Sequence, residues 1–196
     1  KPDYLADVVE QEMMYCKGDI VIIAYVGHGF RSLENNTAYP QLYMGSTKQS
    51  VYYYDLLMDI MGKNPSIVLS IINACNDPIN EYVAAPRTPT SQRWNVITEA
   101  SPNFEVRKTA RYQALFKPVS PYQAISIEFL SSAQNNVTYL TRDGGIFFNA
   151  AMNTLQEYLS KSYAVVWSDI LDLTRIRATE QTNERLNKEQ HPYCNI

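Results

Sequence analysis

The stretch that decides the fold is DIVIIAYVGHGF, residues 19–30, in which an apolar run ends at a histidine between two glycines. Residues 20–26 are apolar without a break, which is typical of a strand buried on both faces of a parallel sheet. Two later runs share this character, SIVLSIINAC at 66–75 and QAISIEFLSSA at 123–133. We therefore predict three strands, the first of them over 19–26.

Helices are predicted between and after these strands. The spacing of apolar residues predicts helices over 4–16, 51–62 and 146–160, and a charged outer face marks another over 168–190. Residues 30–50 are polar and rich in turn formers, so we expect turns there. The alternation of strands and helices predicts an α/β fold, namely a three-layer α/β/α sandwich with a mostly parallel sheet.

One long segment, about 76–122, interrupts this alternation. It contains six prolines and shows little periodicity. A structureless loop of this length is uncommon inside a compact domain and is usually functional or mobile. We therefore predict a single domain over 1–196 that contains a long loop or processing linker at 76–122.

The composition excludes several classes of function. The chain has 196 residues with 17 Lys and Arg against 20 Asp and Glu, a net charge of −3, and 45% of its residues are hydrophobic. This is the profile of a globular domain with a sizeable core. There is no basic block for nucleic acid and no run near the roughly 18 apolar residues of a membrane span. Neither nucleic acid nor a membrane is expected as a partner.

The cysteines indicate a reducing compartment. Cys16, Cys75 and Cys194 form no CxxC pair, and an odd number cannot all pair within the chain. A disulfide framework is therefore not expected, and a cytoplasmic location fits this usage. Residues 1–16 mix acidic with apolar side chains and lack the apolar core of a signal peptide.

His28 and Cys75 each follow a predicted strand, where sites form in parallel sheets. A thiol needs a base or a positive neighbour to react near neutral pH, and histidine is the commonest base. The glycines around His28 allow a sharp turn. Taken singly, Cys75 could be a small core residue and His28 a histidine satisfied within its turn. Together they predict a nucleophile and its base.

Several segments resemble bacterial-type members of the caspase and metacaspase-like cysteine peptidases. VIIAYVGHGFR resembles their histidine strand, SIVLSIINACND their cysteine strand and GGIFFNAAMNTL the helix after the last of these strands. The run WSDILDLTRIRATEQTNERLNKEQHP, with its closing Gln-x-Pro, resembles their last helix. Cys75 follows His28 by 47 residues, close to the spacing of about 50 in caspases. The resemblance implies a caspase–hemoglobinase fold and a thiol protease.

The resemblance also implies the chemistry of a cysteine-type endopeptidase. His28 would act as general base and acid, Cys75 would attack the scissile carbonyl, and the N–H groups of Gly29 and Cys75 would stabilise the oxyanion. A thioester acyl-enzyme would form and then be hydrolysed. This chemistry needs no metal and no cofactor, and no DxDxD-type loop indicates calcium.

The substrate pocket departs from the family pattern. Asn73 stands where caspases have Gln and metacaspases usually have Asp, and Leu140 falls where Asp-specific caspases have an Arg. An acidic P1 side chain would then lack a bidentate partner. The resemblance leaves uncharged candidates for substrate binding, Asn73, Ser132, Gln134 and Asn135 for P1 and Tyr139 for an S2 wall. Ordinary strand-end and loop polarity is the alternative for all five.

The family has further strands and helices before its histidine strand, whereas only 18 residues precede this one. Those first strands either lie on a separate N-terminal fragment of the same precursor or are absent, which would leave an exposed sheet edge. Lys1 would be a cleavage-generated terminus in the first case. Caspases are cleaved in the region of 76–122, and candidates for such autoprocessing here are Arg87, Arg93, Arg107, Lys108 and Arg111, with surface charge as the alternative.

Two other interpretations stay open. The chain could be an inactive caspase-like module for interaction or regulation, or an unrelated α/β binding domain with a core cysteine. The latter requires that His28 and Cys75 lie apart. His191 and Cys194 offer two metal ligands, too few for a zinc site, and no GxSxG, P-loop or GxGxxG signature is present.

Overall fold

The computed structural model describes residues 17–32, 37–44, 49–78, 113–117, 124–141, 144–160 and 165–196. The predicted helix at 4–16 and most of the predicted loop at 76–122 lie outside these residues. Outside them too are Cys16 and the candidate processing positions Arg87, Arg93, Arg107, Lys108 and Arg111.

A four-stranded sheet forms the centre of the protein, in the order β1–β5–β6–β9. The strands β1 (Ile20–Val26), β5 (Ile67–Asn73) and β6 (Ile125–Leu130) run parallel, and β9 (Tyr193–Asn195) pairs with β6 in the antiparallel direction. Every residue of β5 is buried, as expected for a central strand covered on both faces. The three predicted parallel strands are confirmed, and β9 was not predicted.

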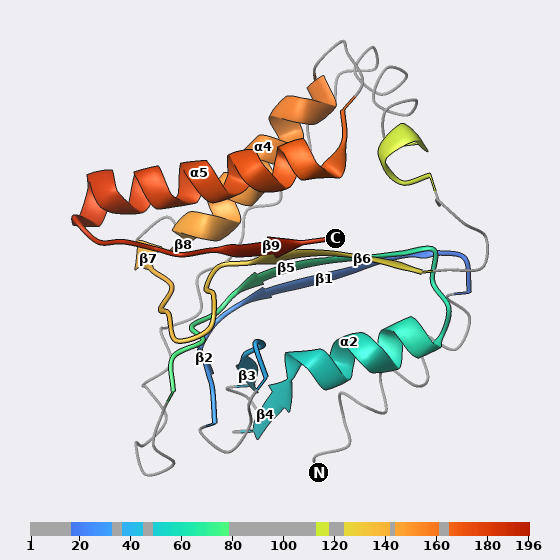
Figure 1. Cartoon of the computed structure of the whole chain (residues 1–196), viewed down its shortest axis with the longest axis horizontal. Helices are drawn as coiled ribbons and strands as arrows, with labels where there is room; N and C mark the ends of the chain where they lie inside the picture. The colour runs from blue at the N-terminus through green and yellow to red at the C-terminus, as the bar shows by residue number, and fades with distance from the viewer. Residues whose placement is uncertain are drawn as a thin grey trace.

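Helices cover both faces of this sheet (Figure 1). The helix α2 (Tyr53–Gly62) lies on one face, and α4 (Ile146–Ser160) and α5 (Trp167–Leu186) lie on the other. Alternate residues of β5 serve the two cores, Leu69 toward α4 and α5 and Val68 toward α2. The protein is therefore a mixed α/β structure with a mostly parallel sheet, an arrangement compatible with an α/β sandwich.

The segment 30–50, predicted to be rich in turns, also contributes strands that were not predicted. A small antiparallel sheet forms there from β2 (Gly29–Phe30), β3 (Gln41–Met44) and β4 (Gln49–Tyr52). Strands of two to four residues are too short to display a period of alternation. Because β4 extends to Tyr52, the predicted helix at 51–62 begins two residues later than expected.

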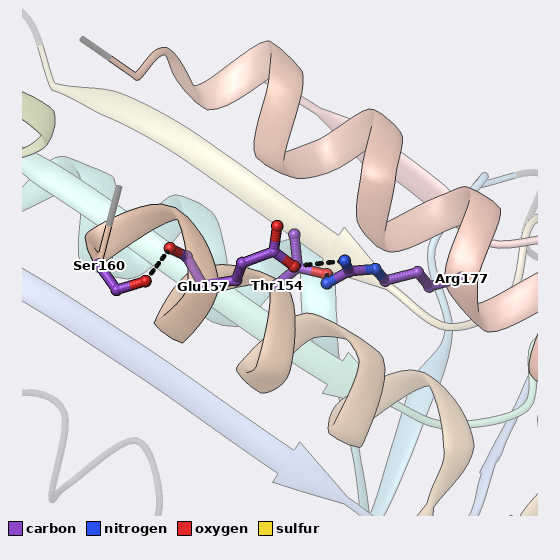
Figure 2. Close-up of polar contacts among 4 residues, drawn as sticks. All are labelled: Thr154, Glu157, Ser160 and Arg177. Carbon is purple, nitrogen blue, oxygen red and sulfur yellow. Dashed lines mark hydrogen bonds and ion pairs between the residues drawn. The ribbon is translucent and has the colours of Figure 1, made fainter. Parts of the chain in front are cut away.

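The helices α4 and α5 are also joined by polar contacts (Figure 2). Arg177 of α5 donates to the hydroxyl of Thr154 at 3.2 Å and forms an ion pair with Glu157, both on α4. The Ser160 hydroxyl donates to the carbonyl of Glu157 at 2.6 Å. Since the ion pair is partly exposed to water, it adds at most about 1 kcal/mol to the apolar packing.

The last helix stops short of its predicted end at 190. Asn187 adopts the left-handed conformation (φ 49°) directly after Leu186 and ends the helix there. None of the helices within the described ranges has the length and apolar character needed to cross a membrane.

The carboxyl ends of β1, β5 and β6 lie on the same side of the sheet (left in Figure 1). The hairpin of β7 (Leu140–Thr141) and β8 (Gly144–Gly145) lies on that side and leads into α4. The loops at this end therefore come together around the strand ends that carry His28 and Cys75.

Candidate active site

The turn that carries His28 is held between β5 and β3. The amide of Gly27 donates to the carbonyl of Asn73 at 3.0 Å and so extends the β1–β5 ladder beyond the last residue of β1. The carbonyl of His28 accepts the amide N–H of Tyr43 at 2.9 Å and the hydroxyl of Tyr25 at 2.8 Å. These bonds fix the backbone from which the imidazole projects.

Gly29 allows the two strand ends to approach closely. A methyl group on its Cα would lie 2.5 Å from the carbonyl oxygen of Cys75 and 2.7 Å from the Cβ of Ala74. Only a residue without a Cβ fits this contact. The backbone beside His28 therefore lies directly against that of Cys75. The His28 Nε2 atom is buried, and within the described part of the chain it has no hydrogen-bond partner.

One peptide group of the loop after β6 contacts the Cys75 thiol. The amide N–H of Thr138 donates to Sγ at 3.4 Å, and the thiol donates to the Thr138 carbonyl at 3.8 Å. Burial raises the pKa of the Cys75 thiol, the contact with Thr138 opposes the rise, and the negative charge of Asp77 adds to it. In this resting arrangement the thiol keeps its proton near neutral pH.

The backbone on either side of Cys75 is held by hydrogen bonds, from buried hydroxyls before it and from a backbone loop after it. The Ser131 hydroxyl accepts the amide N–H of Ala74 at 2.9 Å, and the Ser132 hydroxyl donates to the Ala74 carbonyl at 2.8 Å. On the other side of the cysteine, the backbone of Asn76 exchanges hydrogen bonds of 2.8 and 2.9 Å with the same loop. The end of β5 is thus fixed by the loop that follows β6.

Two of the predicted substrate-binding residues are buried. The Asn73 Oδ1 accepts the amide N–H of Phe148 at 3.3 Å in the first turn of α4, and Gly145 packs against the Asn73 side chain. Ser132 is bonded to the backbone before Cys75. Both side chains therefore lie beneath the site and bond to the protein itself.

The other three predicted substrate-binding residues lie in the loop between β6 and β7. Gln134 and Tyr139 are half-buried and Asn135 is exposed. The guanidinium of Arg31 donates to the Asn135 side-chain oxygen, and the Tyr139 carbonyl accepts the amide of Ile146 at 3.3 Å. This loop borders the strand ends, so its exposed groups are the ones available to a bound molecule.

Four residues that support the site were not predicted. Tyr25 and Arg31 flank the histidine turn, Thr138 contacts the thiol and Gln190 bonds to Thr138. Gln190 is the glutamine of the Gln-x-Pro sequence, which was the one signal available for it. The others have no signature, because their roles depend on which distant segments the fold brings beside them.

The site offers thiol and imidazole chemistry. Cys75 is a free thiol, and Cys194 of β9 is a second one. Burial raises the pKa of Cys194 to about 12, while the charge of Arg175 lowers it and that of Asp172 raises it by smaller amounts. No cluster of three or more His, Cys, Asp and Glu side chains suited to a metal ion is found among the described residues.

Comparison with known proteins leaves the family open. No model of a protein family matches the sequence, and no curated protein does. Among solved structures, the chain is similar to protein GSU0716 from Geobacter sulfurreducens, with 14% identity and a TM-score of 0.46 over 97% of this chain and 72% of that one. A likeness at that level carries no argument about the reaction or its residues.

Proposed function

We propose that the protein is a caspase-like cysteine endopeptidase that hydrolyses peptide bonds through Cys75 and His28. The observation that carries the proposal is the close contact between the backbones of Gly29 and Cys75 at the carboxyl ends of two adjacent parallel strands. This contact favours a base and a nucleophile held side by side. It argues against an unrelated binding domain in which the cysteine is only a core residue.

In the proposed reaction, His28 acts through its imidazole Nε2, which has no hydrogen-bond partner among the residues that the structure describes. The Cys75 proton passes to that nitrogen as Sγ bonds to the peptide carbonyl carbon, and the N–H groups of Gly29 and Cys75 stabilise the resulting oxyanion. His28 then gives the proton to the leaving amine as the C–N bond breaks. Water then attacks the thioester carbon and gives a proton to His28, the C–S bond breaks to release the carboxylic acid, and the proton returns to Sγ.

The raised pKa of the Cys75 thiol favours general-base catalysis over a preformed thiolate. Since the thiol is protonated at rest, its proton must be removed during attack, which is the task assigned to His28. We therefore expect reactivity toward small alkylating agents to be low and reactivity toward a well-placed peptide electrophile to be much higher.

The proposed substrate binds along the loop between β6 and β7. Gln134, Asn135 and Tyr139 would contact the peptide, and the buried Asn73 and Ser132 would support the pocket from beneath. None of the five side chains is charged. An uncharged, hydrogen-bonding P1 residue is therefore expected to be preferred over Asp or Arg.

A separate N-terminal fragment of the same precursor is part of the proposal. Among the described strands, β1 forms one edge of the central sheet. Ile20 and Ile22 of this strand are 44% and 62% exposed. A further segment that packs beside β1 would cover them.

An inactive caspase-like module is the second candidate. The raised pKa of the Cys75 thiol favours it, because a buried thiol that keeps its proton is a poor nucleophile. In that case the same strand ends would serve an interaction or regulatory role.

The two candidates are separated by labelling with peptidyl electrophiles that differ at P1. The variants are Cys75→Ala and His28→Ala, and Cys194→Ala is the matched control because it removes a second free thiol. The peptidase predicts label on Cys75 alone, lost in the first variant and slowed about 100-fold or more in the second. A folded wild-type protein that none of the electrophiles labels would favour the inactive module.

A further inference from the structure

Gln190 is a fully buried amide placed just after α5. Its Nε2 donates to the carbonyl of Ser131 at 2.8 Å and to the hydroxyl of Thr138 at 3.1 Å. The hydroxyl of Thr182 lies 2.9 Å from its Oε1 and 2.7 Å from the Ala178 carbonyl, and it can donate its one hydrogen to either. Both hydrogens of the Gln190 amide are engaged, so this side chain has one permitted orientation.

The two residues that accept the Gln190 hydrogen bonds also contact the segment around Cys75, through other groups than those that bond to Gln190. The hydroxyl of Ser131 accepts the amide of Ala74, the residue before the cysteine. The peptide of Thr138 contacts the thiol itself at 3.4 and 3.8 Å. Gln190 thus spans the two ends of the loop that holds the thiol.

The remainder of the C-terminal segment fixes Gln190 in place. The hydroxyl of Thr179 donates to the Gln190 carbonyl at 3.0 Å, and the carbonyl of His191 accepts the amide of Ala133 at 2.6 Å. The loop and the C-terminal segment are therefore bonded through both backbone and side chain. A displacement of this segment would move the loop that contacts Cys75.

We propose that Gln190 is a positioning residue for Cys75, which holds the Thr138 peptide against the thiol and so sets the reactivity of the thiol. Only the effect of Gln190 on peptide hydrolysis rests on the proposed function. The effect on the thiol is expected whether or not the protein is a peptidase.

Loss of the Gln190 amide should weaken the contact between the Thr138 N–H and Sγ. That contact lowers the pKa of the thiol, so its loss makes the thiolate harder to form. Among the described residues, the titratable groups in the segments that border the thiol are His28 after β1, Arg31 after β2, Asp77 after β5 and Tyr139 in the loop. The neutral substitutions below alter none of them.

The test is the pH profile of Cys75 alkylation by iodoacetamide, followed peptide by peptide with mass spectrometry. Gln190→Met keeps the length of the side chain and removes its hydrogen bonds. Thr182→Val removes the hydroxyl that lies against the amide oxygen. Thr174→Val is the matched control, since Thr174 is a buried threonine of the same helix whose hydroxyl has no partner within the described residues.

We expect the profile of Gln190→Met to move to higher pH, with alkylation about threefold to tenfold slower at pH 7. Thr182→Val should move in the same direction by less, and Thr174→Val should match the wild type. An unchanged profile, or one at lower pH, in either folded variant would overturn the proposal. Melting curves identify which variants fold. The peptidyl-electrophile assay reports separately on the proposed function, because wild-type labelling there does not depend on these variants.

Discussion

The contact between Gly29 and the end of β5 gives the sharpest test of the site. In Gly29→Ala the new methyl group would lie 2.5 Å from the Cys75 carbonyl oxygen, 2.7 Å from the Ala74 Cβ and 3.2 Å from the Gln41 carbonyl oxygen. Ordinary van der Waals contact begins at 3.4 Å, so the two strand ends must separate by about 0.9 Å. Two of the three neighbours are backbone atoms, which cannot rotate away.

The expected cost follows from that displacement. Overpacking of this kind costs about 1–3 kcal/mol of unfolding free energy. For a chain of this size that corresponds to a fall in melting temperature of about 2–12 °C. A shift near 1 Å between nucleophile and base costs about 100-fold in rate, so Cys75 labelling by a peptidyl electrophile should fall far more than stability does.

Gly62→Ala provides the matched control. A methyl group there meets nothing within 4 Å, and Gly62 is the last residue of α2. Because alanine favours a helix over glycine, this variant should be neutral or stabilised by up to about 1 kcal/mol, with unchanged labelling. Thermal unfolding by circular dichroism measures stability, and mass spectrometry measures the label. If Gly29→Ala melts with the wild type and labels at the wild-type rate, the close contact and the reasoning from it are refuted.

Three further predictions concern groups near the site and in the core. Tyr25→Phe removes a hydroxyl that lies 2.8 Å from each of two backbone carbonyl oxygens and donates its hydrogen between them, so it should cost about 1–3 kcal/mol in urea unfolding. Burial raises the pKa of the Glu128 carboxyl in the folded protein. The folded protein therefore loses stability as the pH rises from the ordinary carboxyl pKa through the raised one, because the buried group must then ionise. Glu128→Gln should therefore gain stability relative to wild type between pH 4 and pH 8, measured by melting temperature. Because burial raises the pKa of Cys194 to about 12, iodoacetamide at pH 8 should modify Cys75 before Cys194 in the native protein.

Each of these has an outcome that contradicts it. Urea unfolding of Tyr25→Phe at the wild-type midpoint would mean that its hydroxyl contributes no net stability. A stability gap between Glu128→Gln and wild type that narrows with rising pH would reverse the sign argued for the buried carboxyl. Faster alkylation of Cys194 than of Cys75 would mean that the C-terminal thiol is not shielded by its burial.

The strands were predictable because an unbroken apolar run reports burial on both faces, as in β5, where every residue is buried. The same rule overestimates burial for β1, whose Ile22 is 62% exposed. The register pairs Ile20 with Ile67, which places Ile20 and Ile22 on the face of α4 and α5. Those helices contact β5 and β9. Among the described strands β1 lies at the edge of the sheet, a position in the strand order that the apolar run itself does not encode.

The closeness of the strand ends that carry His28 and Cys75 was predictable from the rule that parallel strands share a carboxyl edge, and the contact between Gly29 and the Cys75 carbonyl agrees with it. The support of the thiol was not predictable. Thr138 lies 63 residues from Cys75 and Gln190 lies 52 residues from Thr138. Hydrogen bonds over such separations depend on how loops close after the sheet has formed, and no local pattern records that.

The place of Asn73, two residues before the cysteine, suggested a position in the substrate pocket. The alternation of side chains along the strand would have given a better prediction. Side chains alternate along a strand, so residue 73 falls on the face of Ile67, Leu69 and Ile71, which pack under α4 and α5. A polar side chain on that face must find a buried partner, and the unpaired N–H groups at the start of a helix are the donors available. The bond from the Phe148 amide at 3.3 Å is the result. The alternation of side chains along β5 therefore places Asn73 against the start of α4. A bound peptide could reach only a part of the Asn73 side chain that this helix does not cover.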